Sequence, residues 1–376
     1  LPIARIRGQG AIFIGKTNTP EFGLGSQTYN PVFGATRNAF NPKLTAGGSS
    51  GGAAVGLATQ MLPVADGSDM MGSLRNPAGF NNVIGFRPSQ GIVPNSSTES
   101  NAYYEQLSTN GPMGRTMEDT IRLLGTMAGH NSSDLTSRQN IIPFYEQCEA
   151  SNLNAYRIGW MGNYQGYLAM ESNVLLVCES ALDQLSDHGS LIENCMPECD
   201  MHKLWETWLT LRHCSMTELI PLFNDPATKL LLKPELHWEI EGSLKVTDTQ
   251  ISEANTTRSN WCRVLQDLFK NYDLLALPAA QVFPFLTDIN WPKNIGGTSM
   301  DTYHRWMEVV IGGTLAGLPI VTLPAGFDSD GRPMGIQFMG PAGNDRKVLE
   351  FAMAYEGVTS YLAQQPKLRA SINDPT

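Results

Sequence analysis

The stretch that decides the fold reads Gly47-Gly48-Ser49-Ser50-Gly51-Gly52, followed by Asp69-Met70-Met71-Gly72-Ser73-Leu74-Arg75. Glycine on both sides of a serine lets backbone N–H groups approach a bound molecule closely, because glycine has no Cβ. A second serine nearby offers a hydroxyl that can relay a proton. Together Ser49 and Ser73 indicate acyl transfer with a serine nucleophile and a backbone oxyanion hole.

The composition is compatible with a large hydrophobic core. The 376 residues are 41% hydrophobic and 16% charged, and the net charge is −10. This acidic balance, without any basic run or basic–aromatic stripe, argues against nucleic-acid binding. No apolar run reaches the roughly 18 residues of a membrane-spanning helix, and no charged-then-apolar signal sequence opens the chain. We therefore expect a cytoplasmic protein that binds neither nucleic acid nor membrane.

The six cysteines are spread through the middle of the chain, unlike a disulfide framework. Cys195, Cys199 and His202 are spaced closely enough to suggest metal ligands, and His213 and Cys214 lie nearby in the sequence. No second half with tight spacing completes the set, so ordinary thiols are the favoured interpretation. We expect no metal ion and no other cofactor.

Hydrophobic periodicity predicts alternating strands and helices. The expected strands are residues 11–14, 62–65, 157–160, 273–278, 319–324 and 335–339, the first of them buried. The expected helices are residues 52–61, 116–127, 171–187, most of 200–270, 306–315 and 345–356. Residues 30–45 are rich in Asn, Pro and Gly and predict a long loop. The alternation is typical of an α/β protein.

Two motif matches are physically poor. Residues 10–17 fit the P-loop pattern, but Ala-Ile-Phe-Ile stands where small residues must cradle phosphate, so nucleotide binding is disfavoured and Lys16 is expected to be structural. Ser49 and Ser50 both fit Gly-x-Ser-x-Gly, yet a nucleophile elbow needs a preceding strand and residues 41–46 read as loop. A flexible glycine turn remains the plain alternative.

Further motifs surround the two serines. They are Gly15-Lys16-Thr17-Asn18-Thr19-Pro20-Glu21-Phe22, Gly85-Phe86-Arg87-Pro88-Ser89, Gly111-Pro112-Met113, Leu323-Pro324-Ala325-Gly326 and Gly331-x-Pro333-x-Gly335-x-Gln337. With residues 47–52 and 66–78, this set resembles the amidase signature family at both ends of the chain. Residues 130–270 carry little that can be matched.

The resemblance implies an α/β/α sandwich around a large mixed β-sheet. It implies a single domain over residues 1–376, with the signature block at about 40–95, a variable, mostly helical substrate region at about 130–270 and a C-terminal core at 271–376. The family's catalytic lysine lies upstream of the Gly15-Lys16-Thr17-Asn18 stretch, so Lys16 does not match it. Because Leu1 reads as lying inside a structural element, we expect an N-terminally truncated form.

The resemblance also implies a Ser–cis-Ser–Lys triad that hydrolyses a linear amide C–N bond. Ser73 would be the nucleophile, Ser49 would relay its proton to the lysine, and the Gly48–Ser49 peptide bond would be cis. Backbone N–H groups would form the oxyanion hole, from Met70, Met71, Gly72 and Ser73. Four residues would support the site: Ser50, Ser68, Asp69 and Arg75.

Two features leave alternatives open. Met71 stands where the family has glycine, so its side chain either obstructs the site or adopts ordinary backbone angles and points away. Trp291, Tyr303, His304 and Trp306 flank a Gly-Gly loop and either line an acyl pocket or pack in the core. No histidine base is expected, because the family mechanism uses none.

Three functional hypotheses follow. The first is an amidohydrolase acting on a small-molecule amide. The second is an inactive or incomplete relative, motivated by Met71 and the unmatched lysine. The third is the glutaminase subunit of a tRNA-dependent amidotransferase, which resembles the family at the same motifs. The oligomeric state is open, with a homodimer as one option.

Overall fold

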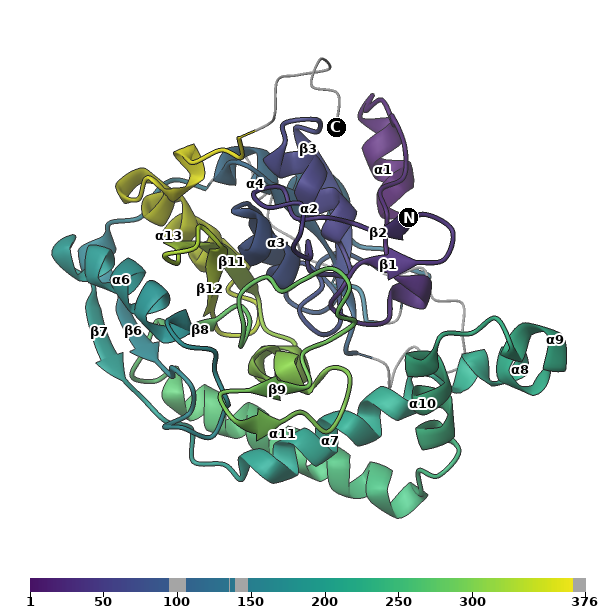
Figure 1. Ribbon diagram of the computed structural model, residues 1–376. Coiled ribbons are helices and arrows are strands. Elements are labelled where there is room, and N and C mark those ends of the chain that lie inside the picture. Colours follow the sequence, from purple (N-terminus) through teal and green to yellow (C-terminus); the bar gives the residue numbers. More distant parts are fainter. Residues whose placement is uncertain (95–105, 135, 139–147, 368–376) are drawn as a thin grey trace.

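A large mixed sheet organises the computed structural model, which describes residues 1–94, 106–134, 136–138 and 148–367 (Figure 1). Its eight strands lie in the order β3-β5-β4-β11-β12-β8-β6-β7. Their bounds are β3 Val64–Asp69, β4 Ile84–Arg87, β5 Thr109–Gly114, β6 Arg157–Trp160, β7 Leu191–Asn194, β8 Leu274–Pro278, β11 Ile320–Phe327 and β12 Pro333–Met339. Pairing is antiparallel from β3 to β8, whereas β6 runs parallel to β8 and β7. The predicted α/β class with a mixed sheet is confirmed.

Helices cover both faces of this sheet. Alternate residues of β8 enter different hydrophobic clusters, because side chains of a strand point to opposite faces in turn. Leu274 and Ala276 pack in the cluster that contains α4 (Met117–Met127), α6 (Val174–Asp187) and α13 (Asp345–Val358). Leu275 and Leu277 pack with residues from the helical region 200–270 and from 306–315.

The predicted helical region 200–270 is confirmed. It contains α7 Met201–Cys214, α8 Ile220–Asn224, α9 Pro226–Lys229, α10 Pro234–Ser243 and α11 Asp248–Leu268. Trp208 of α7 and Trp261 of α11 are fully buried where these two helices pack on the sheet-facing cluster. A capping box of Thr247 and Gln250 begins α11. In Figure 1, α8 and α9 lie at the outer end of this region.

The remaining elements are short. The other α-helices are α1 Pro2–Gly8, α2 Gly51–Ala58, α3 Arg75–Asn81 and α12 Ile311–Leu315. The 3-10 helices are Glu21–Gly23, Leu153–Ala155, Thr217–Leu219, Arg305–Val310 and Tyr361–Ala363. Two small hairpins pair β1 Tyr29–Asn30 with β2 Gly34–Ala35, and β9 Asn294–Ile295 with β10 Thr298–Ser299.

Close backbone packing seats α3 on the sheet. A Cβ placed on Gly335 of β12 would lie 2.7 Å from the Cα of Gly79 in α3, so neither position has room for a side chain. Because α3 begins two residues after Ser73, this contact fixes the position of the serine relative to the sheet.

Several predicted elements were wrong in detail. Residues 11–14 form no strand and are exposed, with Ile12 at 88%, because no strand among the described residues pairs with their backbone. The strand expected at 62–65 begins at Val64 and is half-buried, since β3 lies at the edge of the sheet. The loop expected at 30–45 includes the β1–β2 hairpin, and the helix expected at 306–315 begins with a 3-10 segment. The capped helix at 116–127 is confirmed, with Thr116 accepting from the Asp119 N–H.

Within the described residues, no helix combines the length and the apolar content needed to cross a bilayer.

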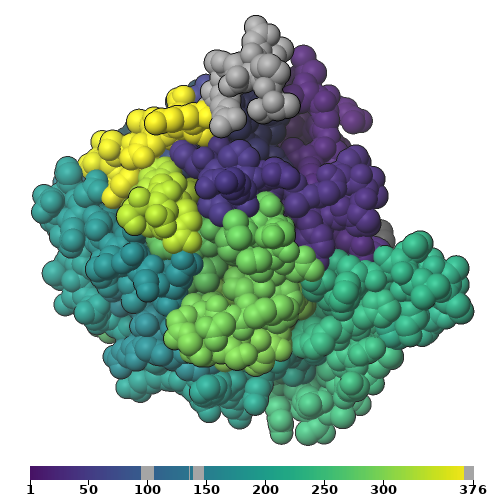
Figure 2. Space-filling view, viewed as in Figure 1, coloured from purple at the N-terminus to yellow at the C-terminus, as the bar shows by residue number. Residues whose placement is uncertain are grey.

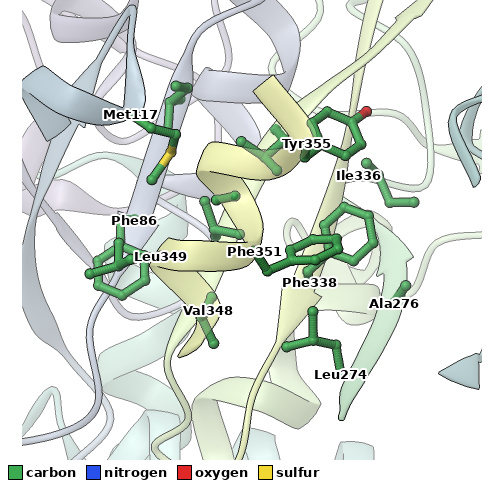
Figure 3. Packing of buried hydrophobic residues seen from close by; sticks show 14 of the residues in the cluster. Phe86, Met117, Leu274, Ala276, Ile336, Phe338, Val348, Leu349, Phe351 and Tyr355 are labelled. Atoms are coloured by element: carbon green, nitrogen blue, oxygen red, sulfur yellow. The ribbon is translucent and has the colours of Figure 1, made fainter. Parts of the chain in front are cut away.

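The core behind α13 gives a direct test of the packing. Phe338 of β12 packs edge-to-face against Phe351 and at a tilt against Tyr355, both of α13, with ring centroids 4.7 and 5.7 Å away (Figure 3). We expect Phe338→Ala to lower the free energy of unfolding by about 3–5 kcal/mol, because it removes a buried ring and leaves a cavity. Urea unfolding measures this loss. Leu230→Ala, at a side chain that is 88% exposed, is the control and should change stability by under about 0.5 kcal/mol.

Candidate active site

Two loops bring the predicted serines together. Residues 47–50, the first serine loop, run into α2, and residues 70–73, the second serine loop, run into α3. The backbone N–H of Ser50 donates to the carbonyl oxygen of Ser73 at 3.2 Å. Ser49 and Ser73 are 6% and 8% exposed, so both lie almost entirely out of water.

The first serine loop is held in a tightly packed conformation. The Gly48–Ser49 peptide bond is cis, as the family resemblance implied. The Gly48 N–H donates to Asn76 Oδ1 at 3.0 Å, and Thr28 Oγ1 donates to the Gly47 carbonyl at 2.8 Å. A Cβ on Gly48 would lie 3.0 Å from the backbone nitrogen of Gln27, so the segment before β1 closes this side of the loop.

A buried carboxylate shapes the second serine loop. Asp69 Oδ1 accepts from the Gly72 N–H at 2.9 Å, and Oδ2 accepts from the Leu74 N–H at 3.2 Å. Arg75 forms a two-pronged ion pair with the same carboxylate, with Nε to Oδ2 and Nη2 to Oδ1 both at 2.9 Å. The loop therefore turns around the Asp69 carboxylate.

Arg75 also joins this loop to the sheet and to the segment after Trp306. Its Nη1 donates to the Val310 carbonyl at 2.8 Å and to Gln337 Oε1 at 2.9 Å, and Nη2 donates to Thr314 Oγ1 at 2.9 Å. The Arg87 guanidinium donates to the Asp69 carbonyl oxygen from the other side. The side chains of Asp69, Arg75 and Arg87 are entirely buried.

The charges of this cluster are shifted by their surroundings. Burial alone would raise the pKa of Asp69, but Arg75, Arg87 and the Leu74 N–H hold it well below its ordinary value. Burial lowers the pKa of Arg87 to about 10, although the Asp69 charge opposes the change. Asp69 is therefore ionised at neutral pH and matched by the two guanidinium groups.

The backbone N–H groups of residues 70–73 differ in availability. The Gly72 N–H is already bound by Asp69. The N–H groups of Met70, Met71 and Ser73 donate to no acceptor within the described part of the chain.

The backbone conformation at Met71 does not require a glycine. Met71 is absent from the described residues with positive φ, whereas Gly72 has φ +79° and a Cβ there would lie 2.9 Å from Met307 Cε. The Met71 side chain is buried in the cluster that includes Phe80 and Leu107. The left-handed backbone conformation therefore lies at Gly72, one residue after Met71, where this chain departs from the glycine of the family.

The two predicted supporting serines differ in position. Ser50 lies at the start of α2, and its Oγ is 2.5 Å from where a Cβ on Gly67 would stand, so Ser50 packs directly on β3. Ser68 is half-buried in β3 opposite Asn110. Within the described residues, its side chain shares no hydrogen bond with Ser49 or Ser73.

The predicted aromatic residues are mainly packed in the core. Trp306 is fully buried, lies 5.3 Å from the Phe285 ring, and donates from Nε1 to the Tyr303 carbonyl at 3.1 Å. The His304 ring is enclosed by Tyr303 and two tryptophans, and burial lowers its pKa to about 3. His304 is therefore neutral. Trp291 is half-buried, with Lys293 Nζ 3.0 Å from its ring centroid.

Three charged residues near the loops were missed by the sequence analysis. Arg212 of α7 reaches Met70 Sδ with Nη1 at 2.6 Å and pairs with Glu239 of α10. Lys233 donates from Nζ to the Leu24 carbonyl at 2.5 Å, and burial lowers its pKa to about 8. No motif marks them, because only the packing of the helical region brings Arg212 to the second serine loop and Lys233 to residues 21–24.

The suggested metal ligands are not grouped. The His202 ring packs edge-on against Tyr167 with centroids 4.8 Å apart, and Cys199 Sγ contacts the Asp200 carbonyl. No group of three or more His, Cys, Asp or Glu side chains suited to a metal ion occurs in the residues that the structure describes.

Comparisons with known proteins assign the chain to a family. A family model described as Amidase matches residues 2–349. A glutamyl-tRNA(Gln) amidotransferase subunit from Thermosynechococcus vestitus is 31% identical over 97% of this chain and 78% of its own length. The acylamidase of Rhodococcus erythropolis is 29% identical over 97% of this chain and 76% of its own. The crystal structure of a bacterial aryl acylamidase of the amidase signature family matches with a TM-score of 0.88 and 27% identity, covering 96% of this chain and 76% of that one.

The chain belongs to the amidase signature family. Its fold and its relatives make it an amide-hydrolysing enzyme that cleaves a C–N bond.

The Asp69 ion pair gives a prediction with a defined pH dependence. We expect Asp69→Asn to lower the free energy of unfolding by about 3–5 kcal/mol at neutral pH, because two buried guanidinium groups lose their carboxylate. Because the pKa of Asp69 is lowered, its stabilisation is present above the ordinary carboxyl value of 3.8 and is lost as pH falls toward the folded-state value. Urea unfolding measured across this pH range should show that the free energy of unfolding falls less steeply with decreasing pH in Asp69→Asn than in the wild type.

The matched control is Asp267→Asn, which breaks an exposed ion pair with Lys270. That change should cost about 1 kcal/mol or less. Equal losses for the two variants would contradict the central position given to Asp69.

Proposed function

We propose that the enzyme hydrolyses a linear amide through an acyl-enzyme on Ser73, with Ser49 as proton relay. The observation that carries the proposal is the joining of the two serine loops: the Ser50 N–H bonds the Ser73 carbonyl next to the cis Gly48–Ser49 peptide. Both serines are buried, so attack on a substrate carbonyl would proceed with little competing water.

In the proposed first step, Ser73 Oγ bonds to the carbonyl carbon and its proton passes to Ser49 Oγ. Ser49 gives its own proton to a lysine, as the family resemblance implies. The C–N bond then breaks, and the nitrogen leaves as ammonia or an amine after taking the proton back. Water attacks the resulting ester, releases the carboxylic acid and restores Ser73.

Lys16 is assigned no part in this transfer. Its side chain is exposed, and it makes no hydrogen bond or ion pair to either serine loop in the described part of the chain.

The oxyanion hole is proposed to lie in the second serine loop. Met70, Met71 and Ser73 supply backbone N–H groups that have no acceptor among the described residues, and the Gly72 N–H holds the loop to Asp69. The loop is thereby arranged before the substrate arrives, so little reorganisation accompanies the reaction. Under this proposal the Met71 side chain packs away in the core and does not obstruct the site.

The substrate is proposed to be a small-molecule amide, acted on by residues 1–376 as one domain. Support comes from the acylamidase of Rhodococcus erythropolis and from the bacterial aryl acylamidase structure. The 31% identical amidotransferase subunit favours a second candidate, the glutaminase subunit of a tRNA-dependent amidotransferase. Free hydrolysis of anilides by the isolated protein would favour the first, whereas glutamine hydrolysis only with added partner subunits would favour the second.

Serine substitution tests the proposed roles. The protein expressed from its complete coding sequence should be labelled by a fluorophosphonate probe, and Ser73→Ala should abolish labelling and lower kcat by roughly a thousandfold or more. Ser49→Ala should slow both labelling and turnover, because the relay is lost. Intact-protein mass spectrometry locates the label.

The matched control is Ser190→Ala, which removes another buried hydroxyl, one that donates to the Leu153 carbonyl at 2.8 Å. This variant should label and turn over like the wild type. A folded wild-type protein that resists the probe, or label on a residue other than Ser73, would count against the proposal.

A further inference from the structure

A buried polar cluster lies against the second serine loop. Its members come from α7, α10 and the segment before the 3-10 helix at 305–310: Arg212, His213, Glu239 and Tyr303. Arg212 Nε donates to Glu239 Oε1 at 2.9 Å, and the Tyr303 hydroxyl donates to the same oxygen at 2.6 Å. His213 Nδ1 lies 3.0 Å from Glu239 Oε2. We call this set the Arg212 cluster.

The cluster is an internally neutralised unit. Burial alone would raise the pKa of Glu239, but Arg212 and the neighbouring hydrogen bonds hold it well below its ordinary value. The Arg212 charge is thereby matched by one carboxylate, and its side chain is almost entirely buried. The orientation of the Arg212 guanidinium is therefore fixed, because a planar guanidinium that is hydrogen-bonded to a carboxylate has lost its rotational freedom.

The free edge of that guanidinium points to the second serine loop. Arg212 Nη1 contacts Met70 Sδ at 2.6 Å, while Nη2 lies 3.4 Å from the Tyr303 hydroxyl. Met70 is the residue directly after Asp69 and opens the second serine loop, in which the Met70, Met71 and Ser73 N–H groups have no acceptor among the described residues. The contact therefore reaches the loop at a residue that the Arg75 side chain does not bond.

Tyr303 of the cluster also lies close to the segment that packs on the first serine loop. A Cβ on Gly25 would lie 3.8 Å from the Tyr303 ring and 3.9 Å from Lys233 Nζ. Two residues further on, the Gln27 backbone packs against Gly48, beside the cis peptide bond. Figure 2 shows the purple N-terminal segment and the teal-green helical segment side by side, and Lys233 N donates to Glu21 Oε1 at 3.0 Å across this contact.

We infer that Arg212 is a positioning residue for amide hydrolysis: anchored by Glu239 and Tyr303, it holds Met70 and so aims the oxyanion-hole N–H groups. This inference rests on the proposed function. Asp69 and Arg75 fix the loop from the sheet side, whereas Arg212 fixes it from the helical region. The helical region 200–270 thus acts on the chemistry of the site as well as covering it.

Turnover kinetics of Arg212→Leu and Arg212→Lys test the role. We expect kcat to fall roughly ten- to hundredfold with KM changed by less than about twofold, because a misplaced loop loses transition-state contacts while substrate binding persists. Arg212→Lys keeps the positive charge but lacks the planar guanidinium, so its kcat should be nearly as low as that of Arg212→Leu. A KM increase with unchanged kcat would overturn the inference, since Arg212 would then bind substrate. Unchanged kinetics would overturn it as well.

A double-mutant cycle separates positioning from general destabilisation. Met70→Ala removes the same contact from the other side, so its effect on kcat should not add to that of Arg212→Lys. Additive losses would overturn the inference. Arg332→Leu is the control, because Arg332 pairs with Glu171 and Asp328 and, in the part of the chain that the structure describes, makes no hydrogen bond or ion pair to either serine loop. If Arg212→Leu does not fold, Arg212→Lys and Met70→Ala carry the test.

A readout independent of turnover distinguishes this inference from the proposed function. In protein labelled with ¹³C-methyl methionine, Arg212→Lys should shift the Met70 methyl resonance, assigned with Met70→Ala, and Arg332→Leu should not. An unmoved Met70 resonance would overturn the contact itself. If the probe does not label Ser73 in the wild type but the Met70 resonance shifts in Arg212→Lys, the proposed function would be contradicted and the Arg212–Met70 contact would still be supported.

Discussion

The ion pair between Asp69 and Arg75 is the interaction on which the site depends. A buried carboxylate is costly unless its charge and its lone pairs are satisfied. Here Asp69 binds Arg75 in two places and accepts from the Gly72 and Leu74 N–H groups, so the turn that presents Ser73 is built around its charge. Arg75 in turn bonds to the Val310 carbonyl and to Gln337, which ties the turn to two distant parts of the chain.

The rest of the structure holds this turn from several directions. The contact of Gly79 with Gly335 seats α3 on the sheet, and the Ser50 N–H joins the first serine loop to the second. The helical region contributes Arg212, whose partner Glu239 keeps its guanidinium facing Met70. These hydrogen bonds and ion pairs limit the ways in which the two serine loops can relax.

Much of the fold and part of the site could be predicted from the sequence. The strand at 157–160 and the capped helix at 116–127 were predictable because apolar spacing and capping residues act over a few positions. The cis bond at Gly48–Ser49 was anticipated because the glycine–serine pattern resembles a known family. Residues 11–14 were misassigned, because an apolar run becomes a strand only where a partner strand pairs with it.

By itself, the sequence determined the family, the mixed α/β class and the two serine loops, since glycine spacing and the order of motifs are local properties of the chain. Only the tertiary structure decided that positive φ falls at Gly72 while Met71 packs in the core, and that the Gly72 N–H is bound by Asp69. It alone brought Arg212 and Glu239 to Met70. The reason is physical: these contacts join helices and loops far apart in sequence, and no short-range pattern records which side chains meet.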